Sequence, residues 1–265
     1  GVQTCALPIF TTNLTGNLGN HMWQYSVCRT VAEKLGYEWG INPSPTHDYH
    51  NGANQMYFMD VNFGKPIENI QNNFYETWVT HNGVNENVNI TPMDNNIWEI
   101  SDNTHIWGAN GAFGAILQSE KYFDKYHDNV KNWFKIKKEY EENYDKKLNE
   151  LGVVLDENTC IINFRGGEYR NIPQVVCRRE YWRDSVNHML RLNPNIKFVV
   201  ISDDPEFASH FMPFQMPIYH IDIGFDFYVI NKSKWVILSN STFGWWAAWL
   251  NDIANLIIAP KYWAS

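Results

Sequence analysis

One stretch of the sequence, "CIINFRGGEYRNIP" at residues 160–173, joins a buried-strand pattern to groups that bind anions. The apolar run that opens it is short enough for a strand buried on both faces. Arg165 then offers a permanent, forked cation suited to a phosphate or a carboxylate. Gly166 and Gly167 permit a close backbone approach to a ligand. Glu168 is suited to accept a proton or a sugar hydroxyl, and a simple Arg165–Glu168 ion pair at a turn is the alternative.

A second strand end carries two adjacent acids, in "FVVISDDPEF" at residues 198–207. Asp203 and Asp204 precede Pro205, a pattern typical of a helix N-cap followed by proline in the first turn. Capping explains one aspartate, so we expect Asp203 or Asp204 to contact a ligand hydroxyl or a guanine-like edge. The sequence contains no Asp-x-Asp motif to indicate a divalent metal that holds a diphosphate, and we predict no metal.

A third strand end has four polar residues in a row, in "VILSNSTFGWWAAWLN" at residues 236–251. Ser239, Asn240, Ser241 and Thr242 precede an aromatic-rich helix. The unpaired N–H groups of a helix N-terminus bind anions, and hydroxyl groups add donors. Ordinary capping by Ser241 or Thr242 is the alternative, but four polar residues exceed what a cap requires.

Elements that bring these strand ends together follow from the regular alternation after residue 150. Strands alternating with helices predict a parallel sheet covered on both faces, and the carboxyl ends of its strands meet at one edge. We expect strands at 158–165, 196–202, 217–221, 235–239 and 255–259, and helices at 178–192, 204–212, 225–233 and 242–251.

The first half of the chain is less regular. A glycine turn and an amphipathic helix are predicted at 14–37, ending at Gly36 as a C-cap. Residues 42–96 resemble loop, short strands are expected at 97–100 and 104–107, and a helical pattern covers 119–151. Together these patterns predict an α/β protein of two lobes, with a boundary near residue 150.

Residues 1–9, "GVQTCALPI", fit no structural pattern and resemble the translation of a sequencing-adapter oligonucleotide. We interpret them as a non-native segment that has overwritten part of the first strand, of which Phe10 to Thr15 remains. A natural N-terminus is the alternative.

Composition excludes several classes of function. The net charge of −8 and the lack of a basic run argue against a nucleic-acid partner. The four cysteines show no paired spacing, which argues against a zinc ribbon or a disulfide scaffold and indicates a reducing compartment. No apolar run in this chain reaches membrane-spanning length. We expect a cytoplasmic protein, with membrane association or a missing N-terminal anchor left open.

Five segments together resemble glycosyltransferase family 11, the α-1,2-fucosyltransferases. They run in the family's order: "TGNLGNHMWQY" (15–25), "LQSEKYF" (117–123), "VVISDD" (199–204), "LSNSTFGWWAAWLN" (238–251) and "APKYW" (259–263). The resemblance implies a GT-B-like α/β architecture, two Rossmann-like lobes with mostly parallel sheets and a cleft between them. Residues 10–150 would bind the acceptor and residues 151–265 the nucleotide sugar. A GT-B fold generally continues into terminal helices, so we expect the second lobe to be truncated.

The activity implied by this resemblance is an inverting transfer of fucose from GDP-fucose to a galactose-type hydroxyl of a glycan, with no cofactor or essential metal. Nucleotide sugar and glycan acceptor would be the partners. One motif departs from the family, which usually has His-x-Arg-Arg-Gly-Asp-Tyr where this chain has Asn-Phe-Arg-Gly-Gly-Glu-Tyr, residues 163–169. A different nucleotide sugar, or a non-catalytic protein that binds nucleotide or carbohydrate, is therefore a competing hypothesis. Arg170, Arg178 and Arg179 are candidates to compensate for the missing arginine.

Roles follow for individual residues. Arg165 and the helix start would stabilise the leaving diphosphate, Glu168 would act as general base, and His21 is the alternative base. We expect the acceptor side to include Gly19, Asn20 and Gln24 on the first glycine turn. The predicted donor-binding residues are Arg165, Gly166, Gly167, Asp203, Asp204, Ser239, Asn240, Ser241, Thr242 and Phe243.

Overall fold

The computed structural model describes residues 9–14, 16–42, 55–65, 72–75, 104–107 and 117–262. The chain divides into two compact units, Gly1–Lys135 and Ile136–Ser265. Residues 1–8 and the strand predicted at 97–100 lie outside the described residues. Across the described parts, no helix combines the length and the apolar character needed to cross a membrane.

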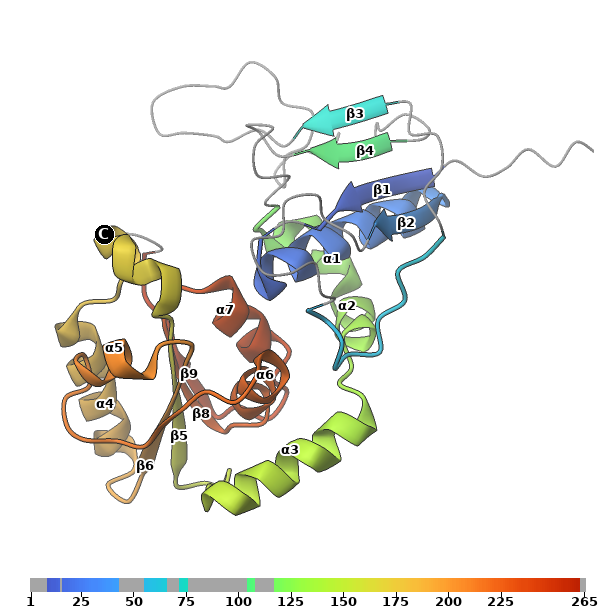
Figure 1. The fold of residues 1–265 in the computed structure, drawn as a ribbon. Coiled ribbons are helices and arrows are strands. Elements are labelled where there is room, and N and C mark those ends of the chain that lie inside the picture. Colours follow the sequence, from blue (N-terminus) through green and yellow to red (C-terminus); the bar gives the residue numbers. More distant parts are fainter. Residues whose placement is uncertain are drawn as a thin grey trace, which may run out of the picture. The chain divides into compact units, whose positions relative to one another are not determined.

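The first unit contains a four-stranded parallel sheet in the order β2-β1-β4-β3 (Figure 1). Helix α1 packs against its strands β1 and β2. Residues 72–75 form a strand inside a segment that was predicted to be loop. The sequence did not indicate this strand, because the two asparagines with which it opens have low β-propensity. The elements are β1 (Ile9–Asn13), α1 (Leu18–Leu35), β2 (Glu38–Asn42), β3 (Asn72–Tyr75) and β4 (Thr104–Trp107).

Helix α1 begins after the glycine turn and ends where the sequence predicts, at Gly36. Gly36 has a φ of 70°, a left-handed conformation that glycine adopts without strain. Nearly every side chain from Leu18 to Ala32 is buried, so the helix is not amphipathic as its apolar stripe had indicated. Polar residues such as Ser26 and Thr30 share this interior.

Arg29 on α1 contacts aromatic rings from other parts of the first unit. The Arg29 guanidinium lies 5.0 Å from the Trp39 ring centroid and 4.3 Å from that of Trp133. It also donates to the Tyr25 hydroxyl (3.0 Å) and to Glu33 (2.8 Å). Burial raises the pKa of Tyr25 to about 12, so this hydroxyl stays protonated. The planar guanidinium thus stacks and forms hydrogen bonds at once, which an ammonium group does less well.

The helical pattern at 119–151 is not one helix. Two 3-10 turns, Glu120–Tyr122 and Asp124–Tyr126, lead into α2 (His127–Trp133), and α3 (Lys138–Leu151) follows a break. Helix α3 therefore lies in the second compact unit, which begins at Ile136, whereas the sequence predicted a boundary near residue 150. There it contacts α6 (Ile223–Asn231): the Tyr228 hydroxyl donates to Asp145 at 2.7 Å, and Lys232 pairs with Glu141 at 2.8 Å.

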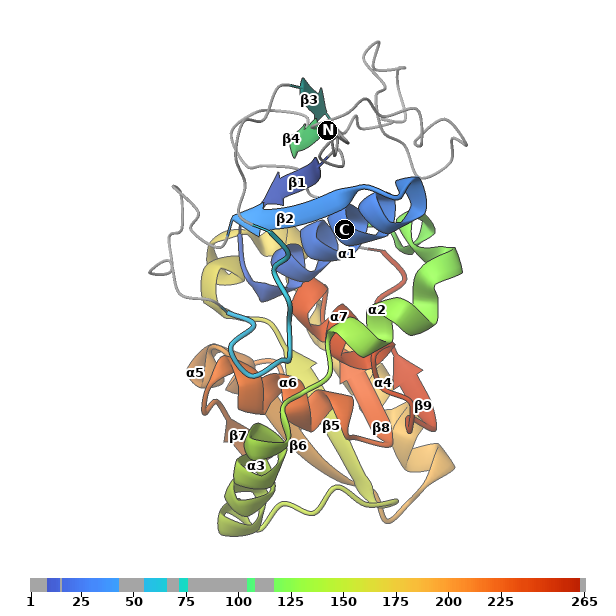
Figure 2. The ribbon, with the colours of Figure 1, turned by 90° about the vertical axis from the view of Figure 1, so that its right-hand side faces the viewer.

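The second unit is a five-stranded parallel sheet in the order β7-β6-β5-β8-β9. Figure 1 shows α4 and α5 on one face of the sheet and α6 and α7 on the other, and Figure 2 shows the unit from the side of α6 and α7. All nine predicted strands and helices are present, namely β5 (Thr159–Phe164), α4 (Arg179–Leu192), β6 (Lys197–Ser202), α5 (Pro205–Ser209), β7 (Ile218–Tyr219), α6 (Ile223–Asn231), β8 (Trp235–Leu238), α7 (Thr242–Trp249) and β9 (Leu256–Ile258).

The strand order gives this sheet a topological switch point. From β5 the chain proceeds outward through β6 to β7 and then returns to lay β8 on the other side of β5. Ligands of open α/β sheets bind where the order reverses, beyond the carboxyl ends of the strands. Here that place is the gap between the ends of β5 and β8, at Phe164 and Leu238. Both strands are buried throughout their middle, which holds their ends in place.

Replacing Arg29 by alanine removes two ring contacts and two hydrogen bonds. We expect the free energy of unfolding of the first unit to fall by about 2 kcal/mol, visible as a lower melting temperature in tryptophan fluorescence. Arg29→Lys should recover only part of the loss. Arg183→Ala is the matched control, since Arg183 is 57% exposed and pairs with its neighbour Asp184 on the surface. Equal melting of the Arg29→Ala and Arg183→Ala proteins would contradict this account.

Candidate active site

Arg165 is held at the switch point by groups from both neighbouring strands. Its backbone N–H donates to the Ser239 hydroxyl, at the end of β8, over 3.1 Å. Its guanidinium forms an ion pair with Asp203, directly after β6. The Tyr169 ring lies 5.4 Å away. The side chain is 21% exposed, so the cation is partly shielded yet still reachable from solvent.

The two glycines after Arg165 make room for the two aspartates. The Gly166 N–H donates to Asp203 Oδ1 at 2.7 Å, and a Cβ at Gly166 would lie only 2.5 Å from the Cβ of Asp204. Gly167 has a φ of +33°, and a Cβ there would collide with the carboxylate of Asp203. The sequence interpretation assigned this space to a ligand, whereas the structure fills it with protein. A contact between the donor and the backbone of either glycine therefore stays a prediction.

The two aspartates have different partners. Asp204 caps α5 by accepting from the Phe207 N–H at 3.0 Å, and it pairs with Arg170 at 2.7 Å. Asp203 is the partner of Arg165 and of the Gly166 N–H. The predicted cap is thus Asp204, and the second acid holds the arginine. A ligand contact by either one stays a prediction.

Burial is the main influence on the charge of Arg165. It lowers the pKa of the guanidinium, while Tyr169 and Glu168 act in the opposite direction. An arginine starts so far above neutrality that it remains protonated. Glu168 lies 3.9 Å from the guanidinium and is 60% exposed. The predicted pair of Arg165 with Glu168 is therefore loose, and Asp203 is the stronger partner.

The four polar residues after β8 have two different roles: the first two are buried and the last two begin α7. Ser239 and Asn240 are buried, and the Asn240 amide donates to the Val175 carbonyl at 3.2 Å. Ser241 occupies the N-cap position of α7, but its side chain makes no capping hydrogen bond. The simple capping explanation is therefore wrong for Ser241. The first backbone N–H groups of a helix carry a partial positive charge that suits an anion, and Thr242 and Phe243 at this helix start are partly exposed.

Asn163, where the family usually has histidine, was missed as a site residue. Its side chain is buried, and its Oδ1 accepts from the Ser239 hydroxyl at 3.3 Å. Gly244 on α7 packs so closely on this amide that a Cβ would collide with it. Asn163 therefore supports both Ser239 and the start of α7. The signal in the sequence was a polar residue within a buried apolar strand.

Arg170 was predicted only as a replacement for the missing arginine of the motif, and a fourth strand end was not predicted to carry site residues. Arg170 lies over the Phe207 ring at 5.2 Å and pairs with Asp204. After β7, the His220 ring is hydrogen-bonded through Nδ1 to Asp226 at 2.6 Å. A histidine near the end of the strand predicted at 217–221 was the signal for this pair. In the part of the chain that the structure describes, no three His, Cys, Asp or Glu side chains gather as metal ligands would, and metal independence stays a prediction.

The predicted acceptor-side residues lie on the first turns of α1. His21 and Gln24 are buried, with 4% and 1% exposure, and Gly19 is buried as well. The Asn20 side chain accepts from Gln118 at 3.0 Å. These residues belong to the first unit and Arg165 to the second, so their meeting at one site stays a prediction.

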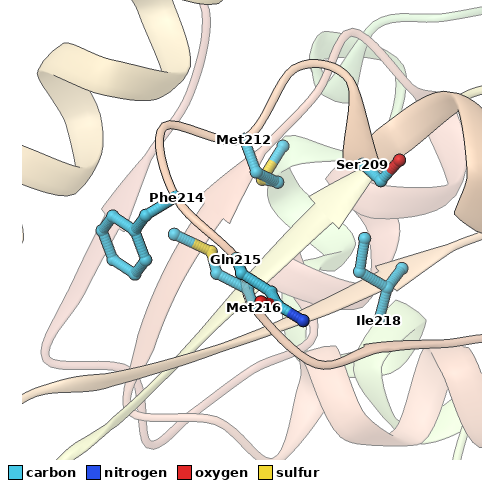
Figure 3. Close-up of a pocket in the computed structure, with 6 residues that line it drawn as sticks. All are labelled: Ser209, Met212, Phe214, Gln215, Met216 and Ile218. Carbon is cyan, nitrogen blue, oxygen red and sulfur yellow. The ribbon is translucent and has the colours of Figure 1, made fainter.

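A pocket of about 360 Å³ opens in the segment that leads from α5 back to β7. Figure 3 shows two methionines and a phenylalanine among its lining side chains. None of the strand-end residues described above lines it. The lining residues are Ser209, Met212, Phe214, Gln215, Met216 and Ile218.

Solved structures with the same fold include two fucosyltransferases. POFUT1 in complex with GDP-fucose has a TM-score of 0.57 at 9% identity, covering 98% of this chain and 99% of that one. The NodZ α-1,6-fucosyltransferase soaked with GDP-fucose has a TM-score of 0.53 at 12% identity, covering 96% and 95%. The predicted GT-B-like α/β fold is confirmed by these likenesses and by the two parallel sheets.

Sequence comparison identifies the family. An alpha-1,2-colitosyltransferase of Escherichia coli is 24% identical over 284 residues, covering 97% of this chain and 93% of the relative. The O-antigen biosynthesis glycosyltransferase WbnK of Escherichia coli is 24% identical over 283 residues, covering 94% and 93%. The model of glycosyl transferase family 11 matches residues 67–265, which include every strand end described above. The chain belongs to glycosyltransferase family 11.

Proposed function

We propose that this glycosyltransferase transfers fucose from GDP-fucose to a galactose-type hydroxyl of a glycan, with inversion at the anomeric carbon. The observation that carries the proposal is the bond of Arg165 to Ser239, which places the arginine next to the residues that lead into the N-terminus of α7, at the switch point of the sheet. A cation and a helix N-terminus together suit a diphosphate. The GDP-fucose bound to POFUT1 and NodZ, which share this fold, supports the choice of donor.

In this mechanism the acceptor oxygen attacks the anomeric carbon while the bond from that carbon to the diphosphate breaks. The hydroxyl proton passes to a general base, and the bonding electrons leave with the diphosphate. Arg165 and the first N–H groups of α7 stabilise the charge that develops there. Because Ser239 and Asp203 already hold Arg165, little reorganisation is needed in the transition state.

Glu168 is the proposed general base. Its carboxylate is 60% exposed and only one 3-10 turn removed from Arg165, so an incoming hydroxyl can reach it. His21, the alternative, is only 4% exposed. An acceptor hydroxyl needs direct contact with the base, which favours Glu168.

A second donor is supported by a specific observation. One relative is named an alpha-1,2-colitosyltransferase, and Asn163 and Gly166 replace the histidine and arginine of the usual family motif. Both substitutions lie at the strand end that would face the donor. GDP-colitose is therefore the competing donor for the same site and the same mechanism.

The choice between the donors is tested by transfer assays with GDP-fucose and GDP-colitose on a panel of galactose-terminated acceptors. We expect kcat/KM to be at least tenfold higher with GDP-fucose than with GDP-colitose, because the site is proposed to bind the transition state of fucose transfer more tightly. A preference for GDP-colitose would replace the fucose proposal. Tight GDP binding without transfer or donor hydrolysis would indicate a protein that only binds.

Calorimetric titration with GDP, UDP and GDP-fucose tests the nucleotide site directly. We expect the wild-type protein to bind GDP and GDP-fucose and to discriminate against UDP. Arg165→Ala should weaken GDP binding about 10- to 100-fold, since it removes a charge-assisted hydrogen bond. Arg183→Ala, on the exposed surface of α4, should bind like the wild type. Unchanged affinity in Arg165→Ala would remove Arg165 from the site.

The base assignment is tested by Glu168→Gln, which keeps size and polarity but cannot accept a proton. We expect kcat to fall at least 100-fold while GDP affinity stays within about twofold. The matched control is Glu180→Gln on exposed α4, which should retain full activity. If Glu168→Gln keeps full transferase activity, the base is another residue.

A further inference from the structure

Asp226 on α6 is the only buried Asp, Glu, Lys or Arg among the residues that the structure describes. Its side chain is 6% exposed. The carboxylate accepts from the His220 ring at Nδ1 over 2.6 Å and more distantly from the Ile221 N–H at 3.4 Å. Burying a carboxylate is unfavourable unless a partner compensates, and the imidazole of His220 is that partner.

His220 lies at the same edge of the sheet as the diphosphate site. Strands β6 and β7 pair in register, with Val200 opposite Ile218 and Ile201 opposite Tyr219. The next residue in this register, His220, is therefore level with the last residue of β6, just before Asp203. Strand β7 is two strands from β5, a separation of about 10 Å at the usual spacing between strands. A nucleoside diphosphate whose phosphates lie at the end of β5 is long enough to span this distance.

The pair presents one nitrogen of the imidazole to a ligand. Nδ1 is bound to Asp226, so Nε2 is the remaining ring nitrogen, and 41% of the side chain is exposed. The hydrogen bond to Asp226 raises the pKa of His220, and nearby Asp222 acts in the same direction. In the protonated ring both nitrogens are donors, so Nε2 can donate to a ligand while Nδ1 is bound to Asp226. Ile221 beside it is 40% exposed and offers apolar surface to a flat ring.

We propose that His220 is a nucleobase contact of the donor site, donating from Nε2 to the N7 and O6 edge of a purine, and that Asp226 is its positioning residue. This inference rests on the proposed function, since it assigns the base of the same nucleotide whose phosphates lie at Arg165. A purely structural role of the pair, joining α6 to the end of β7, is the competing explanation. It would affect all nucleotides alike.

The test is calorimetric binding of GDP, of 7-deaza-GDP, which lacks N7, and of 2-aminopurine riboside diphosphate, which lacks O6. We expect wild-type protein to bind GDP about tenfold more tightly than at least one of the two analogues, the effect of one hydrogen bond to a charged donor. In His220→Ala this preference should fall to within twofold. His188→Ala, an exposed histidine of α4, should keep it.

The outcomes separate the two proposals. If the wild type binds no nucleotide, the proposed function fails. If the wild type binds GDP and His220→Ala either retains the preference or loses affinity equally for all three ligands, only the assignment of His220 is overturned.

His220→Ala leaves the Asp226 carboxylate buried without its partner, so its melting temperature must be measured alongside. Should it be unfolded at the assay temperature, the double variant His220→Ala with Asp226→Asn replaces it, because it removes that buried charge. The same loss of preference is expected in the double variant, and retention would overturn the assignment. Asp226→Asn alone should lower the preference only in part, as the amide still orients the ring without the charge.

Discussion

The ion pair between Asp203 and Arg165 is the interaction on which the rest of the candidate site depends. It links the end of β6 to the end of β5, while the bond from Arg165 N–H to Ser239 links β5 to β8. Three adjacent strand ends are thus joined at the point where the strand order reverses. Because both groups are partly buried, their attraction is less screened than that of a surface pair. A guanidinium held in this way is preorganised for an anion.

The same geometry leaves the strand-end cluster with little net charge. Arg165 is matched by Asp203 and Arg170 by Asp204, and Glu168 adds a further negative charge nearby. In the proposed site, a diphosphate would meet paired arginines and share Arg165 with Asp203. The start of α7, where the Ser241 side chain makes no capping hydrogen bond, supplies positive potential of the order of half an elementary charge. Under this proposal, donor binding depends on the helix end as much as on the arginine.

The unusual motif of this chain is consistent with its neighbours. With glycine at position 166, Asp204 can approach the backbone closely, and Arg170 then pairs with Asp204 from the turn that follows. An asparagine at position 163 accepts from Ser239 and fits against Gly244. The substitutions are thus built into the packing around the strand ends. They do not loosen Arg165, which keeps its bonds to Asp203 and Ser239.

The sequence by itself determined the second unit, because its alternating strands and helices are regular and its glycine and proline signals are local. The nine strands and α-helices that follow α3, their parallel sheet and the polar residues at three strand ends were predictable from the pattern. The first unit was harder to predict, since strand β3 opens with two asparagines and since the apolar stripe of α1 did not indicate burial on nearly all sides. The extent of α3 and the unit boundary depended on contacts with α6, which are remote in sequence.

Only the tertiary structure decided which partner each residue of the candidate site has. The sequence showed two aspartates, but not that Asp204 caps the helix while Asp203 holds Arg165. It showed the glycines, but not that carboxylates of the protein fill the space beside them. It also left His220 and Asp226 unconnected, because their pairing requires β7 and α6 to be placed together. Local patterns specify elements, whereas the partners of a charged group depend on which strand ends the topology makes adjacent.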